Sequence, residues 1–360
     1  MKVGIVTQPL SANYGGILQN YALQQALKKI GHEPFTFDLG KYTWCDWFVV
    51  VCKTIIKKCL KRNCSFPETP TQKKRIEQPL RDFVLRKIKL MHPRCKRLDK
   101  SLVDKYKLDA LVVGSDQVWR PLYNYYISDM FFDFAKDKDV KRVAYAASFG
   151  TDKWEYNATQ ENICKSLAKK FDAVSVREDS GVMLCKEKLD VSAEHVLDPT
   201  LLLDVEEYKK LTEGCPEDGR KILFAYILNP NDEKIRHINS VAEKLDLIPV
   251  IKGAEGNVET NDSIEGWLSL FRDARYVITD SFHGSVFSII YNVDFHAIGN
   301  MNRGLSRMMS LLKSFGLESR LLSESSLEKA ELAEIDWSSV NLKKSELKEM
   351  SVYFLQNALK

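Results

Sequence analysis

The sequence has 360 residues, of which 44% are hydrophobic and 28% charged. These values exclude a disordered or fibrous chain, and the length exceeds what one hydrophobic core usually serves. The net charge of +4 does not by itself indicate a polyanionic partner, but the charge is concentrated, since residues 53–97 hold 15 Lys and Arg against 3 acidic residues. We therefore expect two domains and one basic segment.

The N-terminal region has the pattern of a strand, a glycine loop and a helix. Residues 3–7 form a short apolar run, residues 13–16 supply a polar loop with two glycines, and residues 17–30 have helical spacing. A second strand follows at residues 35–38. This unit is typical of the first βαβ of a doubly wound domain with buried parallel strands.

A basic segment at about 44–100 is expected to be a helical insertion or a mobile flap, because it is polar and contains four prolines. The longest uncharged apolar run in its helix at 44–62 is too short to span a bilayer. It fits either a solvated face or an interfacial helix on an anionic membrane, whereas nucleic acid binding lacks a recognisable reader fold. The predicted apolar face consists of Trp44, Trp47, Phe48, Val51, Cys52, Ile55 and Cys59.

Alternating strands and helices occupy most of the remaining chain. Strands are predicted at 110–114, 143–150 and 173–178, each ending in polar or glycine residues. After residues 198–200 a second alternation begins, with strands at 222–227, 248–251 and 276–280, helices at 232–244, 264–271 and 285–291, and a helical tail within 326–360. We expect a first Rossmann-like domain at 1–198, carrying the insertion, and a second at 199–360, carrying the tail.

The cysteines and the N-terminus indicate the cellular compartment. None of the eight cysteines forms a CxxC pair, so neither a structural zinc site nor a disulfide framework is expected. The first residues turn polar too early for a secretory signal. We expect a cytoplasmic protein with reduced thiols, held at the inner face of the cell membrane if the basic segment binds lipid.

The turn after the predicted strand at 276–280 is best suited to acid–base chemistry. This strand would deliver His283 to the sheet edge, where Gly284 and Ser285 are expected to open a helix with free N–H groups. An imidazole beside an anion site suits proton transfer. The alternative is that Ser281 and His283 only cap the helix.

Other polar groups could contact an anion or a sugar. Arg177 follows a strand and could bind a phosphate or carboxylate, or could only form a salt bridge with Glu178 or Asp198. The same alternatives apply to Arg303 and Arg307. The glycine loop and a polar turn, which could also be the start of a capped helix, contribute Asn13, Gly15, Ser115, Asp116 and Gln117.

Together these motifs resemble the polysaccharide pyruvyl transferase family. The resemblance rests on the order and spacing of the motifs from residue 2 to about residue 320, and no single motif decides it. It covers nearly everything except the basic insertion and the C-terminal tail. The stretches that carry it are 13–16 with the helix at 19–27, then 114–119, 145–150, 177–178, 198–200 and 279–284.

The resemblance implies an α/β fold of two Rossmann-like domains facing each other across a cleft, similar to the glycosyltransferase-B architecture. It also implies a reaction in which the enolpyruvyl group of phosphoenolpyruvate is transferred to two hydroxyls of one sugar. The products are a cyclic pyruvate ketal and phosphate, and the family serves capsular and exopolysaccharide synthesis. The sugar acceptor commonly sits on a lipid diphosphate carrier. Phosphoenolpyruvate is a substrate here, and no cofactor or metal is expected.

Carried over residue by residue, the resemblance makes His283 the general acid/base. Arg177 matches an arginine that holds the donor, and Arg303 lies where members place another basic residue. The expected donor and phosphate site comprises Arg177, Ser281, Gly284, Ser285 and Arg303, and the expected acceptor side of the cleft comprises Asn13, Gly15, Ser115, Asp116 and Gln117.

One position departs from the family pattern. Members often carry an arginine two positions before the histidine, and this sequence has Ser281 there. A serine cannot supply a bidentate cationic grip, so Arg275, Arg303 or Arg307 compensates or the donor is not phosphoenolpyruvate. A nucleotide-sugar-dependent glycosyltransferase and a non-catalytic glycan-binding protein are the alternative functions.

Overall fold

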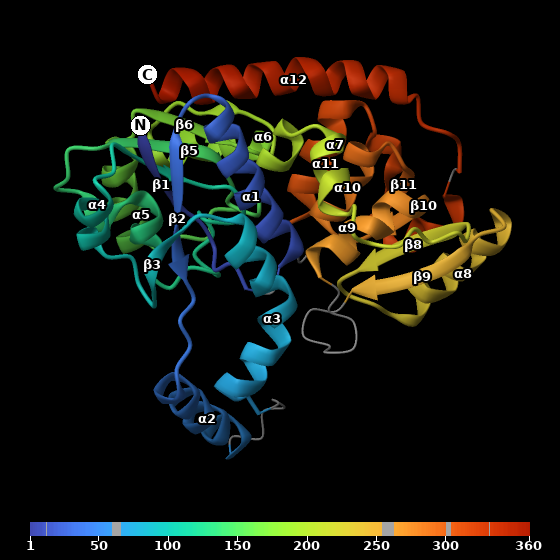
Figure 1. Cartoon of the computed structure of the whole chain (residues 1–360), viewed down its shortest axis with the longest axis horizontal. Coiled ribbons are helices and arrows are strands. Elements are labelled where there is room, and N and C mark those ends of the chain that lie inside the picture. The colour runs from blue at the N-terminus through green and yellow to red at the C-terminus, as the bar shows by residue number, and fades with distance from the viewer. Residues whose placement is uncertain (12, 60–65, 254–262, 300–303, 331) are drawn as a thin grey trace.

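The computed structural model describes residues 1–11, 13–59, 66–253, 263–299, 304–330 and 332–360. Over these residues the strands form one seven-stranded and one five-stranded sheet, and the paired strands are parallel. The two sheets lie side by side along the longest axis of the molecule, with helices around them (Figure 1). The expected α/β architecture with two parallel sheets is confirmed.

The first sheet has the strand order β3-β2-β1-β4-β5-β6-β7. The order reverses between β1 and β4, which is the switch point of a doubly wound sheet. Its central strands read as continuous apolar runs because helices cover both faces, and β4 is buried along its whole length. The strands are β1 (Lys2–Val6), β2 (Glu33–Leu39), β3 (Leu90–Cys95), β4 (Ala110–Val113), β5 (Lys141–Ala147), β6 (Ala173–Val176) and β7 (Glu194–His195).

The second sheet has the order β12-β11-β10-β8-β9, and its switch point lies between β8 and β10. β8 is also buried along its whole length. The strands are β8 (Ile222–Ile227), β9 (Ile248–Gly253), β10 (Ala274–Thr279), β11 (Asp294–Ile298) and β12 (Leu321–Leu322).

The helices alternate with the strands as the sequence predicts, and the predicted helix at 232–244 has the observed bounds. The helices predicted to start at residues 17 and 285 begin three residues earlier. The side chains of the N-cap residues Asn13 and Ser281 accept backbone N–H groups, so each helix begins directly after its cap. The helices are α1 (Tyr14–Lys29), α2 (Trp44–Cys59), α3 (Pro70–Lys87), α4 (Lys100–Tyr106), α5 (Ala158–Ala168), α6 (Asp179–Leu184), α7 (Val205–Leu211), α8 (Asp232–Lys244), α9 (Ile264–Asp273), α10 (Phe282–Tyr291), α11 (Leu305–Phe315) and α12 (Trp337–Ala358).

The insertion predicted at 44–100 is too long. β3 pairs with β2 at the edge of the first sheet, and Leu80, Phe83 and Val84 of α3 are buried in the same core cluster as residues of α1. The prolines in this segment argued against a regular helix and strand in the sequence. In the structure Pro70 begins α3, Pro79 lies inside it, and Pro93 is tolerated because β3 is an edge strand. Of the described parts of this segment, α2 is the helix that stands away from both sheets (Figure 1).

The C-terminal helix α12 contacts both sheets. Figure 1 shows it running across the top of the molecule, from the second sheet to the first. Val340 packs in the cluster around the second sheet, whereas Phe354 and Leu355 pack with Val3 and Tyr145 of the first. The tail expected to belong to the second domain therefore also completes the core of the first. A division of the chain near residue 198 stays a prediction.

Candidate functional site

The switch points of the two sheets face each other across a cavity of about 80 Å³ that is partly open to solvent. In open α/β sheets ligands bind at the carboxyl ends of the strands at such a point, and here two of these edges are opposed. The loops after β1 and β4 line one side, and the end of β8 with the turn after β10 lines the other. The lining residues are Asn13, Gly15, Asp116, Gln117, Tyr123, Tyr226, Leu228, Asp280, Ser281, Phe282, His283 and Arg307.

The first turn of α1 brings the two sides into contact. Asn13 caps this helix by accepting the Gly16 N–H at 3.0 Å, so that Gly15 lies in the first turn, against the ring of His283. A Cβ placed on Gly15 would be 2.0 Å from His283 Nδ1, far inside van der Waals contact. Glycine is required here because the backbone and the imidazole approach so closely.

His283 lies in the first turn of α10, directly after the N-cap residue Ser281. Its side chain is only 8% exposed, and its Nε2 lies 3.8 Å from Asp198 Oδ2, an ion-pair distance and not a hydrogen bond. Nε2 has no hydrogen-bond partner among the described residues. Since Ser281 makes the cap, the imidazole is not needed for it and has a polar atom left for a ligand.

Arg177 is wholly buried between two aspartates. Its Nη1 donates to Asp198 Oδ2 at 2.8 Å and its Nη2 to Asp116 Oδ1 at 3.0 Å. Ser115 Oγ also donates to Asp198 Oδ2, at 3.0 Å. The salt-bridge alternative for Arg177 is therefore realised with Asp198, and Asp116 is a second partner. The arginine does not line the cavity, although its Nε has no partner among the described residues.

The two aspartates are ionised despite their burial. Burial alone would raise the pKa of Asp198, but the interactions with His283 and Arg177 outweigh it and hold that pKa far below its usual range. The pKa of Asp116 is lowered in the same way, by Arg177, His283 and Arg307 against the effect of burial. The carboxylate beside His283 is therefore anionic at neutral pH.

Arg307 of α11 is the arginine that lines the cavity. Its guanidinium lies over the Phe282 ring at 5.6 Å, and that of Arg177 lies over the same ring at 4.5 Å. Burial and the charge of Arg177 lower the pKa of Arg307 to about 10, so it remains a cation at neutral pH. Burial also raises the pKa of the neighbouring Glu178, which the two arginines only partly offset.

Asp280 lines the cavity, but its carboxylate is used in structural contacts. It accepts the Leu228 and Asn229 N–H groups at 2.6 and 3.1 Å and pairs with the buried Lys234 at 2.9 Å. Both partners are at most 1% exposed. The Asp280 carboxylate thus joins the residues after β8 to the end of β10, and so holds the turn that presents His283.

The structure brings most of the predicted site residues together. Asn13, Gly15, Asp116, Gln117, Ser281 and His283 line the cavity, whereas Ser115 and Arg177 lie buried behind Asp116. Gly284 and Ser285 are buried within α10. Residues 115–119 form a turn, so the alternative of a capped helix start there is wrong. The predicted site residue Arg303 lies outside the described residues.

Arg275 cannot compensate for the missing arginine. It is exposed at the beginning of β10, at the opposite edge of the sheet from the cavity. The sequence reasoning missed Tyr123, Tyr226 and Leu228. The last two lie at the end of a predicted strand, which was a usable signal, whereas nothing in the sequence places Tyr123 near the cleft.

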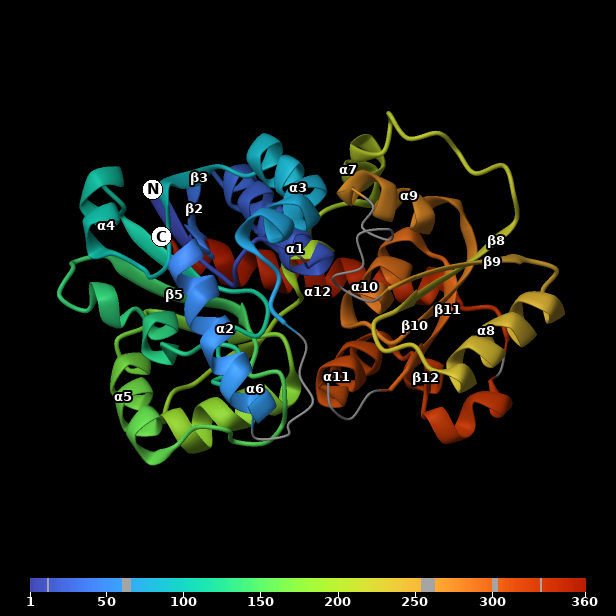
Figure 2. The same cartoon turned by 90° about the horizontal axis from the view of Figure 1, so that it is seen from below.

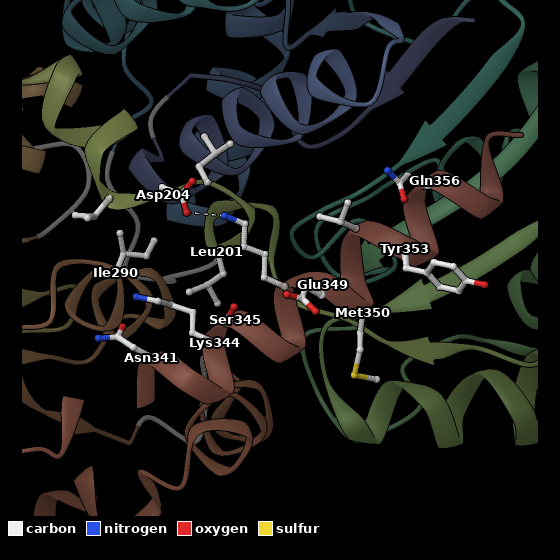
Figure 3. A pocket seen from close by; sticks show the side chains of 14 residues that line it. Leu201, Asp204, Ile290, Asn341, Lys344, Ser345, Glu349, Met350, Tyr353 and Gln356 are labelled. Carbon is white, nitrogen blue, oxygen red and sulfur yellow. Dashed lines mark hydrogen bonds and ion pairs between the residues drawn. The ribbon is translucent and has the colours of Figure 1, made fainter. Parts of the chain in front are cut away.

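A larger hollow of about 930 Å³ lies between α12 and residues 201–205 (Figure 3). Lys348 and Asp204 both line it, and the Lys348 Nζ pairs with Asp204 Oδ1 at 2.6 Å. None of the predicted site residues lines this groove. Within the described residues no group of three or more His, Cys, Asp or Glu side chains could hold a metal ion. No helix in the same parts of the chain is long and apolar enough to cross a membrane.

Three of the solved structures that are similar to this chain illustrate the likeness. S. aureus MnaA, solved with UDP, is 10% identical, with 99% of this chain and 91% of that chain covered and a TM-score of 0.50. The UDP-GlcNAc 2-epimerase of Methanocaldococcus jannaschii is 11% identical, with 95% and 98% covered and a TM-score of 0.50. The spinosyn rhamnosyltransferase SpnG with thymidine diphosphate is 9% identical, with 99% and 96% covered and a TM-score of 0.44.

These likenesses, at 10% and 11% identity, define the fold class: a glycosyltransferase-B-like α/β protein with two parallel sheets, as the sequence predicts. None of the curated proteins matches the sequence. The family model for polysaccharide pyruvyl transferase matches residues 13–302. The chain belongs to this transferase family.

Proposed function

We propose that the chain transfers pyruvate, as a ketal, from phosphoenolpyruvate to a sugar of a cell-surface glycan precursor. The observation that carries the proposal is the convergence of His283 and the cation Arg307 on one cavity between two switch points, in a chain of this family. The donor has a phosphate and a carboxylate, so it needs cations and helix N-termini, and both border this cavity.

In the proposed reaction His283 donates a proton to the methylene carbon of phosphoenolpyruvate. Protonation leaves an oxocarbenium-like carbon, and the first sugar hydroxyl attacks it and gives up its proton. Cleavage of the C–O bond to phosphate regenerates a cationic carbon, which the second hydroxyl attacks with loss of its proton. His283 gives one proton to carbon, and of the two protons that the hydroxyls release, one leaves with phosphate and the other returns to His283. The anionic Asp198 lies 3.8 Å from His283 Nε2, so the proton-transfer group has a carboxylate next to it.

Arg307 takes the place of the arginine that the family often carries where this chain has Ser281. It comes from a different element, α11, yet lines the same cavity as Ser281. Since it remains a cation at neutral pH, it can hold the donor's phosphate or carboxylate. Donor contacts through Arg177 and Arg303 stay predictions, and the two carboxylates on Arg177 make it a positioning residue for Asp116 and Asp198.

The cavity is partly open to solvent, and its volume of about 80 Å³ lies below the roughly 300 to 1,000 Å³ of ordinary ligand sites. Tyr123 lines the cavity and is 49% exposed, and the Arg120 guanidinium lies over its ring at 5.0 Å, so a sugar would have to contact the ring away from Arg120. We assign the acceptor side to Tyr123 with Asn13 and Gln117.

The test is a melting-temperature screen with phosphoenolpyruvate, inorganic phosphate and nucleotide sugars on the parent chain, on His283→Ala and on Arg307→Met. A ligand that binds only the native state raises its stability. Phosphoenolpyruvate should raise the melting temperature of the parent and of His283→Ala, which keeps the cation, but not of Arg307→Met. The matched control is Arg272→Met, since this largely buried arginine pairs with Asp273 outside the cavity.

Turnover is then measured as phosphate release with a panel of sugar acceptors, and His283→Ala should abolish it. A stabilising effect of nucleotide sugars alone would instead favour a nucleotide-sugar-dependent glycosyltransferase. Binding of glycans without turnover of any donor would favour a non-catalytic glycan-binding protein. Either result would contradict the proposed reaction.

A further inference from the structure

Helix α2 extends from the body of the molecule and leaves one side uncovered. Figure 1 shows it below the first sheet, and Figure 2, seen from below, shows it in front of the other elements. Among the described residues, its polar contacts and its buried side chain lie on one side: Thr54 is buried, Asp46 pairs with Lys96 at 2.7 Å, and Trp47 Nε1 donates to Pro67 O at 3.2 Å. Trp47 therefore faces the protein and does not belong to the exposed apolar face expected from the sequence.

The uncovered side of α2 is continuous and apolar. At 3.6 residues per turn its eight members span an arc of about 140°, and no charged residue falls within that arc. The three largest, Trp44, Phe48 and Ile56, are 56%, 64% and 60% exposed. We call this surface the α2 face; it consists of Trp44, Cys45, Phe48, Val49, Cys52, Ile55, Ile56 and Cys59.

Cations flank the α2 face. Lys53 and Lys57 lie beyond one edge of the arc and Lys58 beyond the other, and all three are exposed. A hollow of about 800 Å³ next to the start of α2 is lined by Lys73 and Lys74 among other residues. Exposed apolar side chains bordered by lysines are the chemistry of a helix that lies in a membrane interface.

We propose that the α2 face binds the surface of an anionic lipid bilayer, with its apolar side chains among the acyl chains and its lysines at the phosphates. Charge complementarity selects this occupant: the described helix carries one acidic residue, Asp46, and that carboxylate is paired with Lys96. Two copies of the face would bring their lysine borders together and repel each other. An anionic headgroup layer neutralises the same lysines, each of which adds attraction.

The position of α2 agrees with this orientation. β2 runs toward α2 in Figure 1, so the helix lies on the side to which the carboxyl ends of the first sheet point. α12 lies on the opposite side. A chain docked through the α2 face would therefore turn the cleft side of its first sheet to the bilayer.

The experiment is co-sedimentation of the full chain with phosphatidylcholine vesicles with and without phosphatidylglycerol. The parent should sediment with the anionic vesicles, less so at high salt. The double variant Phe48→Glu, Ile55→Glu should bind at least about 100-fold more weakly, since two apolar side chains are lost from the buried face. Neutralising Lys57 and Lys58 with glutamine should weaken binding about fivefold for each lysine.

The matched control is Leu342→Glu, Tyr353→Glu, at two α12 positions that are 64% and 65% exposed. It should bind like the parent, and circular dichroism checks that all variants are folded. Brominated lipids should quench tryptophan fluorescence less in Trp44→Phe than in the parent. The proposal is wrong if the parent does not sediment with anionic vesicles, or if the double variant Phe48→Glu, Ile55→Glu binds them as tightly as the parent. It is also wrong if the parent self-associates through the α2 face and this variant does not.

Discussion

The contact between Gly15 and His283 allows a sharp test of the site, by the substitution Gly15→Ala. A Cβ at this position would lie 2.0, 2.1 and 2.6 Å from three atoms of the imidazole. Ordinary contact needs about 3.5 Å, so the ring or the facing helix must move by about 1.5 Å. A displacement of about 1 Å of a catalytic group can cost about 100-fold in rate. We expect a loss of kcat of that size or larger.

Gly16→Ala is the internal control, because it changes the next residue of the same helix. Its Cβ would lie 3.3 Å from Asn13 Cγ, so the capping side chain of Asn13 would have to shift by only a few tenths of an ångström. Both substitutions favour the helix by up to about 1 kcal/mol in intrinsic propensity, so only the clash distinguishes them. Phosphate release from phosphoenolpyruvate reports the rate, and urea unfolding reports stability. Equal rates in the two variants would refute the assignment of His283 to this position and role.

Three further predictions concern stability, all measured by urea unfolding. Lys234→Met removes the cation that pairs with the buried Asp280, directly after β10, and with Glu324, and should cost about 3–5 kcal/mol, whereas Lys221→Met, in a pair that is 72% and 99% exposed, should cost almost nothing. His296 is buried and its pKa is lowered by that burial to about 3, so the unfolded chain takes up its proton first as the pH falls. Stability should drop by about 2 kcal/mol between pH 6.5 and 5 through this residue, and the drop should shrink in His296→Gln; a parent curve that is flat over this window would contradict it. Leu355→Ala should cost about 2–5 kcal/mol and Leu342→Ala, at a 64% exposed position of the same helix, under 0.5; similar costs would mean that the end of α12 does not complete the first core.

The regular elements could be predicted because their signals are local. Strands that are buried on both faces are continuous apolar runs, and β1, β4, β8 and β10 stand out in the sequence for that reason. Polar residues at the ends of these strands pointed to Asp116 and His283, since parallel strands place their carboxyl ends at one edge. β3 was missed because an edge strand is half exposed and tolerates proline.

The sequence by itself determined the two-sheet α/β class, the family and the turn that carries His283, because these depend on periodicity, turn residues and motif order within short stretches. Only the tertiary structure decided the partners. It paired Arg177 with Asp116 and Asp198, set Gly15 against His283, and brought Arg307 to the cavity from a helix that follows β11. A contact between residues that are distant in sequence leaves no local signal in the sequence. Which of these residues meet is decided by how the two sheets and their helices pack.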